Sequence, residues 1–197
     1  VGAYGEGYYS TTTNTDGAAY VYLGSSSGID VSTEVHLTAS DGSAGDLYGY
    51  AVAGQGDLDG DGYDDIVVGA YGVVDSATWE GAAYVYYGSV SGVTAASEVR
   101  LAASDADGRE YFGVSVAMPG DVDGDGNDDL LVGARGEDVD YSGQGAAYLY
   151  LGSATGIVES SEQKIDGPES QANLAFGTVA RVGDVDSDGY DDLFIGA

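Results

Sequence analysis

Three acidic segments contain the residues whose types and spacing are best suited to binding a metal ion. The first runs from Asp57 to Asp65 with the sequence DLDGDGYDD, which places carboxylates at positions 1, 3, 5 and 9 of a nine-residue loop. Calcium takes about six to eight oxygen ligands, and alternate residues of a tight loop point inward. Glycine at position 6 permits the sharp reversal, and position 7 offers a backbone carbonyl. The pattern therefore predicts one calcium site in each loop.

The same positions recur in the second and third acidic segments. The predicted ligands are Asp57, Asp59, Asp61, Tyr63 and Asp65 in the first loop, Asp121, Asp123, Asp125, Asn127 and Asp129 in the second, and Asp184, Asp186, Asp188, Tyr190 and Asp192 in the third, with the position 7 residue contributing its carbonyl. Three calcium ions would raise the formal net charge from -29 to about -23. Magnesium is the minor alternative, because it prefers a smaller octahedral site that retains more water.

Two other interpretations of the acidic loops were weighed. The helix-loop-helix calcium hand shares the first six positions, but it requires glutamate at position 12 and flanking helices. Position 12 is occupied by Val68, Val132 and Ile195, each inside an apolar run of β type, so the sequence excludes this motif. The second alternative is that the Asp-Gly pairs only make polar turns. Three loops that retain every ligand position favour a cation site, because closely packed carboxylates repel one another.

The elements that must position these loops recur with a period of about 64 residues. The segment GAAYVYLGS at 17–25 has counterparts at 81–89 and 145–153, and an aromatic-glycine pair recurs at 48–49, 112–113 and 176–177. Such a period indicates that one supersecondary unit is used repeatedly.

Each repeat contains four runs typical of β-strands. In the copy that begins at Tyr48, we expect strands at 48–53, 66–70, 82–87 and 98–102. The third run is apolar or aromatic on both faces, which predicts a strand buried between two stacked sheets. The expected fold class is therefore all-β, with β-propeller blades of four antiparallel strands in three repeats.

The repeat boundaries predict how the chain is divided. Residues 1–47 are expected to form a partial blade, 48–111 and 112–175 two complete blades, and 176–197 the start of a further blade. Both chain ends fall at the same place within a repeat, so we expect a segment of a longer chain or assembly. Open blade edges offer self-association as an alternative, in which molecules join head to tail into a fibre.

The composition excludes several classes of partner. With 34 acidic and five basic residues, the chain would be repelled by nucleic acid and by anionic membrane surfaces. No apolar run reaches the roughly 18 residues needed to span a bilayer. Cysteine is absent, which excludes disulfides and thiol chemistry.

The sequence contains no group of catalytic residues that stands apart from the repeat. His36 is the only histidine, and its repeat equivalents are Arg100 and Lys164, so a structural charge pair is favoured over a general base. The chain is therefore not expected to be an enzyme, and a polysaccharide-active propeller is the alternative. The stretches 5–16, 73–80 and 136–144 differ between repeats and are the expected positions for a protein or glycan ligand. Trp79 is expected to pack against the next blade, with stacking on a sugar as the alternative.

These motifs resemble the FG-GAP repeat family, which forms the blades of integrin α-subunit propellers and of many bacterial surface proteins. The resemblance rests on the aromatic-glycine pairs, with Tyr48 in place of phenylalanine, on the acidic loops, and on Gly-Ala at Gly2, Gly69, Gly133 and Gly196. The proline that usually follows is replaced by Tyr4, Tyr71 and Arg135. The resemblance implies an extracellular or cell-surface propeller for adhesion, ligand binding or surface structure, with loops stiffened by calcium.

Overall fold

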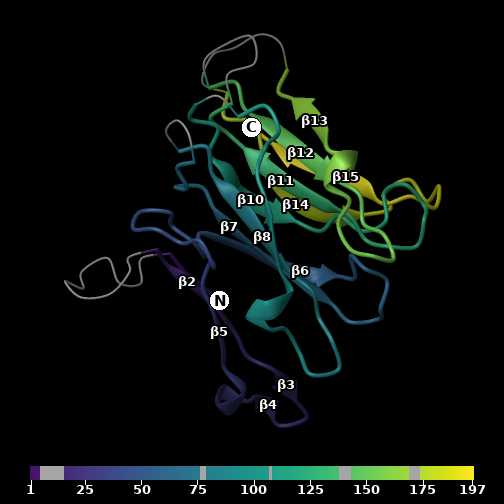
Figure 1. Ribbon diagram of the computed structural model, residues 1–197. Coiled ribbons are helices and arrows are strands. Elements are labelled where there is room, and N and C mark those ends of the chain that lie inside the picture. The colour runs from purple at the N-terminus through teal and green to yellow at the C-terminus, as the bar shows by residue number, and fades with distance from the viewer. Residues whose placement is uncertain (5–15, 76–78, 107, 138–142, 169–173) are drawn as a thin grey trace.

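The computed structural model describes residues 1–4, 16–75, 79–106, 108–137, 143–168 and 174–197 (Figure 1). Regular structure in these ranges consists of β-strands and three short 3-10 turns, η1 (Val31–Thr33), η2 (Ala95–Ser97) and η3 (Glu159–Ser161). None of the described segments is a helix long and apolar enough to cross a membrane. The predicted all-β class is confirmed.

Two four-stranded antiparallel sheets form the centre of the structure, and in both the strands are neighbours in chain order. The strands of the first sheet are β6 (Ala51–Gly56), β7 (Asp65–Ala70), β8 (Ala82–Tyr86) and β9 (Glu98–Leu101). Those of the second are β10 (Phe112–Ala117), β11 (Leu130–Ala134), β12 (Ala146–Tyr150) and β13 (Gln163–Asp166). Equivalent pairs keep the same register, for example Val68 opposite Tyr84 and Val132 opposite Tyr148.

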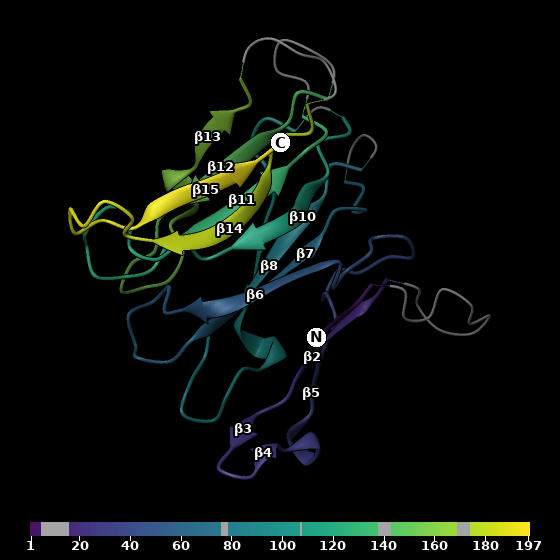
Figure 2. The ribbon, with the colours of Figure 1, turned by 180° about the vertical axis from the view of Figure 1, so that it is seen from behind.

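Smaller sheets flank these two. The other strands are β1 (Gly2–Ala3), β2 (Ala18–Val21) and β5 (Val35–Leu37) in a three-stranded sheet, β14 (Thr178–Gly183) and β15 (Asp192–Gly196) in a pair, and β3 (Gly24–Ser25) and β4 (Gly28–Ile29) in a short hairpin. The sheets stack face to face in chain order (Figures 1 and 2), and β10 contacts β6 and β7 on one side and β14 on the other. This stacking of four-stranded sheets is the blade architecture of a β-propeller.

The core lies between the stacked sheets. Every residue of β8 and β12 is buried, as predicted for a third strand covered on both faces. The aromatic residue that begins each repeat enters this core: Phe112 lies edge-on to Tyr148 with ring centroids 5.4 Å apart, and Tyr48 lies likewise against Tyr84 at 5.3 Å. Where tyrosine replaces phenylalanine, its hydroxyl is satisfied by a hydrogen bond of 2.7 Å to the Tyr86 hydroxyl.

The first strand of the blade begins later than the sequence predicts. Residues 48–53 were expected to be extended, whereas β6 spans Ala51–Gly56. Gly49 adopts φ +84, which interrupts the extended backbone, and Tyr48 instead forms an isolated parallel bridge with Gly17 of the preceding sheet. The aromatic residue of the pair thus bridges to the preceding sheet at Tyr48, as Phe112 and Phe176 also do, and in this blade it does so before β6 begins.

Neighbouring sheets approach so closely that side chains are excluded at some positions. A Cβ atom at Gly69 would lie 1.9 Å from the carbonyl oxygen of Gly113, and one at Gly133 would lie 1.7 Å from that of Gly177. These distances are far below van der Waals contact, and the neighbouring atom is backbone in both cases. Backbone contact between blades thus explains the glycine of the Gly-Ala motif at Gly2, Gly69 and Gly133.

Replacing Gly69 with alanine should destabilise the protein by about 3 kcal/mol or more, because the added methyl group forces two packed sheets apart. Gly54→Ala is the matched control within the same sheet, since the nearest atom to its added Cβ would be 3.6 Å away. Thermal unfolding followed by circular dichroism measures the difference. Equal unfolding temperatures for the two variants would contradict the proposed role of backbone contact.

Candidate metal centres

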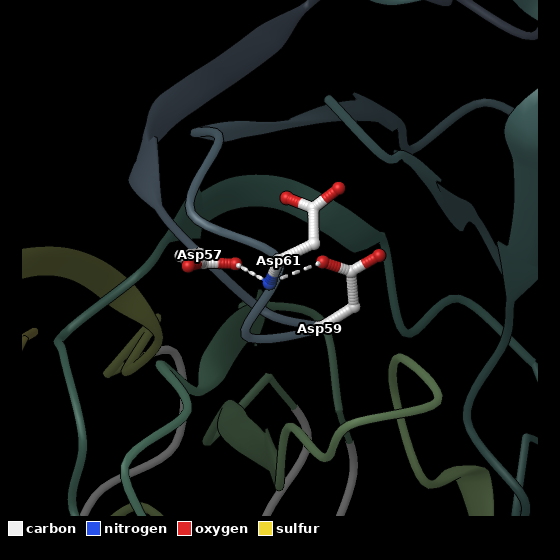
Figure 3. Close-up of side chains that lie close together, drawn as sticks. All are labelled: Asp57, Asp59 and Asp61. Carbon is white, nitrogen blue, oxygen red and sulfur yellow. Dashed lines mark hydrogen bonds between the residues drawn. The ribbon is translucent and has the colours of Figure 1, made fainter. Parts of the chain in front are cut away.

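Each acidic loop connects the first strand of a sheet to the second, and its conformation is fixed by its own aspartates. The carboxylate of Asp57 accepts hydrogen bonds from the backbone N–H groups of Asp61 (3.0 Å) and Gly62 (2.8 Å), and Asp59 accepts a second bond from Asp61 (3.2 Å) (Figure 3). Gly60 and Gly62 adopt φ +67 and +91, a region that favours glycine. Asp121 and Asp184 accept the corresponding bonds in the other loops.

In each loop three carboxylates offer oxygen atoms within 4.8 Å of one another. The sets are Asp57, Asp59 and Asp61; Asp121, Asp123 and Asp129; and Asp184, Asp186 and Asp192. Figure 3 shows the first set. All the donors are hard carboxylate oxygens without histidine or cysteine, so the residues fit a hard divalent cation such as calcium or magnesium.

Electrostatic repulsion within the first set is visible at Asp59. Partial burial raises the pKa of its carboxyl group, and the neighbouring charges of Asp61 and Asp57 raise it further. A bound cation would reverse this effect by favouring the ionised carboxylates.

The sequence predicts that positions 5 and 9 both join the ligand set, whereas the structure brings only one of them together with positions 1 and 3. In the first loop this is Asp61 at position 5, and in the second and third loops it is Asp129 and Asp192 at position 9. In the first loop position 7 lies close to the set, because the backbone N–H of Tyr63 donates to Asp61 at 2.9 Å. In the other two loops Asn127 and Tyr190 donate equivalent bonds, at 2.9 and 3.0 Å, to the position 5 aspartates, which lie outside those sets. A ligand role for their carbonyls stays a prediction.

Position 9 has a structural role that spacing alone does not reveal. Asp65 is fully buried, and its two oxygens accept hydrogen bonds of 2.7 Å from the backbone N–H groups of Leu58 and Gly88. Asp129 accepts the equivalent bonds from Val122 (2.7 Å) and Gly152 (2.8 Å). Burial raises the pKa of both carboxyl groups to about 6, against the lowering effect of these bonds. In these two loops position 9 therefore ties the loop to the second residue after the third strand.

The basic residues equivalent to His36 are part of the blade interface. Lys164 lies 2.7 Å from both Asp105 and Glu137, and Arg100 forms ion pairs with Asp41 and Asp75. Although burial opposes its charge, the hydrogen bonds that Lys164 donates to Asp105 and Glu137 raise its pKa to about 12. The predicted charge pairs are thus confirmed for Arg100 and Lys164.

His36 itself stacks on Tyr20, with ring centroids 4.9 Å apart. The glutamates that precede Arg100 and Lys164 by two residues are not their partners. Glu98 accepts from the Tyr86 hydroxyl (2.7 Å) and Glu162 from that of Tyr150 (2.6 Å).

The variable stretches are described only in part. Residues 5–15, 76–78 and 138–142 lie outside the described ranges. Trp79 packs against Tyr111, the last residue of its own repeat, with ring centroids 5.7 Å apart, and its packing against the next blade stays a prediction. Its side chain is still 48% exposed, and the guanidinium of Arg109 lies 5.9 Å from its ring centroid.

Stacked four-stranded antiparallel sheets, each with an acidic loop between its first and second strands, define this chain as a β-propeller blade protein. A family model described as "FG-GAP repeat" matches residues 31–86 and 96–150. The chain belongs to the FG-GAP repeat family.

Curated relatives that match include integrin α subunits. The chain is 33% identical to integrin alpha-PS5 of Drosophila melanogaster over 159 residues, 36% to integrin alpha-4 of Xenopus laevis over 156, and 34% to integrin alpha-7 of Homo sapiens over 182. These matches cover 78%, 78% and 91% of this chain but only 15%, 14% and 14% of the relatives. The chain thus spans about one seventh of their length.

The two roles within a loop can be separated by substitution in the absence of metal. Asp129→Ala should lower the free energy of unfolding by about 2 kcal/mol in excess chelator, because two backbone donors lose their acceptor. Asp123→Ala is the matched control in the same loop. Asp123 is exposed, so its loss should change metal-free stability by less than about 0.5 kcal/mol.

Urea denaturation of the two variants in EGTA provides the measurement. If both variants lose the same metal-free stability, position 9 has no structural role distinct from that of position 3.

Proposed function

We propose that this chain is an extracellular, cell-surface propeller segment that binds calcium and serves in adhesion through a protein ligand. The observation that carries the proposal is the convergence of three carboxylates in each of three equivalent loops. Membership of the FG-GAP repeat family and similarity to integrin α subunits support the adhesive role. The chemistry of the donor set supports a hard cation.

In this proposal each loop holds one calcium ion, three in all, on the fifteen residues that the loop spacing predicts. Residues 48–111 and 112–175 are the complete blades, 1–47 belong to a partial blade and 176–197 to the start of a further one. Calcium is preferred to magnesium because a loop with several carboxylates and a backbone carbonyl can supply more ligands than the octahedral magnesium site requires.

The expected place for a ligand is the end of the blade opposite the acidic loops. The connection from β6 to β7 holds the acidic loop, and in an antiparallel sheet the connection from β7 to β8 must leave from the other end. The half-exposed Trp79 and the variable stretches belong to this second connection. Glycan binding and head-to-tail association stay predictions, as does the absence of enzymatic activity.

Removing calcium should lower the melting temperature of the protein. A cation that binds only the folded state stabilises it by about 2.7 kcal/mol per site when its concentration is about 100 times the dissociation constant. Differential scanning calorimetry with added calcium and with EGTA measures the shift. The same concentration of magnesium should produce a smaller shift.

Two controls are needed because a chain with a net charge of -29 is stabilised by any salt. Sodium chloride at matched ionic strength measures this general effect. A variant with Asp59, Asp123 and Asp186 all replaced by alanine removes position 3 from every loop and should respond to calcium no more than to sodium. A wild-type melting temperature that is identical in calcium and in EGTA would refute the proposed calcium binding.

A further inference from the structure

The aspartate at position 8 of each loop lies outside the predicted ligand set, yet in two of the three loops it contacts another blade. These residues are Asp64, Asp128 and Asp191. Asp128 and Asp191 are partly buried, whereas Asp64 is exposed. The acidic loops lie side by side in chain order at the right-hand edge of Figure 1 and the left-hand edge of Figure 2, which brings position 8 of one loop to the loop before it.

A reciprocal pair of hydrogen bonds joins successive loops. The backbone N–H of Asp57 donates to the carboxylate of Asp128 (3.1 Å), and the backbone N–H of Asp128 donates to the carbonyl of Asp57 (2.9 Å). Asp121 and Asp191 repeat the arrangement one blade later, at 3.1 and 2.9 Å. In both cases position 8 holds the backbone of position 1, the first predicted ligand of the preceding loop.

Around these bonds, the glycines of one loop fit closely against side chains of the next loop. A Cβ atom at Gly60 would lie 2.4 Å from the side-chain oxygen of Asn127, and one at Gly124 would lie 2.6 Å from the ring of Tyr190. Glycine at position 4 thus leaves room for the position 7 side chain of the next loop. A Cβ at Gly120, just before position 1, would lie 1.6 Å from the carboxylate of Asp191. The loops are therefore built to be in contact.

We propose that Asp128 and Asp191 are positioning residues that couple the metal loops of adjacent blades. Each fixes the backbone of the first ligand in the preceding loop, so that cation binding in one blade depends on the blade that follows. The coupling between sites rests on the proposed calcium binding. The reciprocal hydrogen bonds that join Asp57 to Asp128 and Asp121 to Asp191, which we call the clamp, do not. Asp57 has a central place in its loop, because its carboxylate also accepts from Asp61 and Gly62. Disturbing its backbone should therefore disturb the whole set.

Asp64 provides a matched control within the same chain. It occupies position 8 of the first loop and has the same charge, but within the described part of the chain its carboxylate forms no hydrogen bond with another loop. Replacing Asp64 or Asp128 with alanine removes one negative charge in either case. Among the described residues, the Asp128 substitution alone removes a bond between blades, together with a 3.7 Å ion pair to Arg181.

The clamp can be tested without metal by amide hydrogen exchange in EGTA, measured by NMR. Asp128→Ala should lower the protection of the Asp57 amide by about tenfold, equivalent to about 1.4 kcal/mol. Asp64→Ala should leave it unchanged. Asp191→Ala offers a second, independent case, read at the Asp121 amide, should the Asp128 variant fail to fold. Unchanged protection of the clamped amide, relative to the Asp64 variant, would overturn the clamp.

The coupling is tested by calcium titration calorimetry in a background where Asp123→Ala and Asp186→Ala leave only the first loop intact. Asp128→Ala should weaken calcium binding there by about 5- to 10-fold, the lower range for coupled sites. Asp64→Ala should weaken it less, although Asp64 belongs to the very loop being measured.

The outcomes separate the two proposals. Loss of amide protection with an unchanged calcium affinity would overturn the coupling and leave the clamp in place. If the variant with only Asp123→Ala and Asp186→Ala binds no calcium, the proposed function and the coupling are both overturned. The hydrogen-exchange experiment would still show whether the clamp exists.

Discussion

The structure depends on sheets packing against one another at backbone contact distance. No sheet of the described chain covers its own faces, and the third strands β8 and β12 are buried on both. Burial on two sides requires a sheet above and a sheet below, so the blade cannot be considered as an isolated unit. The Gly-Ala motif, the aromatic-glycine bridge and the tyrosine-rich core are all consequences of this one constraint.

The same constraint determines how the few positive charges are used. Two of the five basic residues, Arg100 and Lys164, each form an ion pair with a carboxylate of the preceding blade. A third, Arg181, donates a hydrogen bond to the Gln55 carbonyl two blades away. Among the described residues, no basic side chain forms a salt bridge with positions 1, 3, 5 or 9 of an acidic loop. Apart from the 3.7 Å ion pair between Arg181 and Asp128 at position 8, the described basic side chains leave the charge of the acidic loops to be balanced by ions from solution.

Much of the fold and of the candidate site could be predicted from the sequence because both repeat. The 64-residue period and the two-faced apolar run of 82–87 were sufficient to predict blades and their buried third strand. The spacing of the aspartates was sufficient to locate the carboxylate clusters. What could not be predicted depends on neighbours in space: Tyr48 bridges to Gly17 of the preceding sheet, and Asp65 is held by Gly88, twenty-three residues away. The recurrence of aspartate at position 8 is visible in the sequence, but the role of Asp128 could not be predicted because its partner belongs to another repeat.

The position of the loops indicates how a cation would influence the rest of the molecule. In the first two loops, position 9 is bonded to the second residue after the third strand of its own sheet, and position 1 is bonded to the next loop. A cation that orders positions 1 and 9 together would therefore stiffen a blade and its junction with the following blade at once. The variable stretches begin at the opposite end of the same strands, so a bound cation does not touch a ligand there. Its effect on recognition would be transmitted through the rigidity of the stacked sheets.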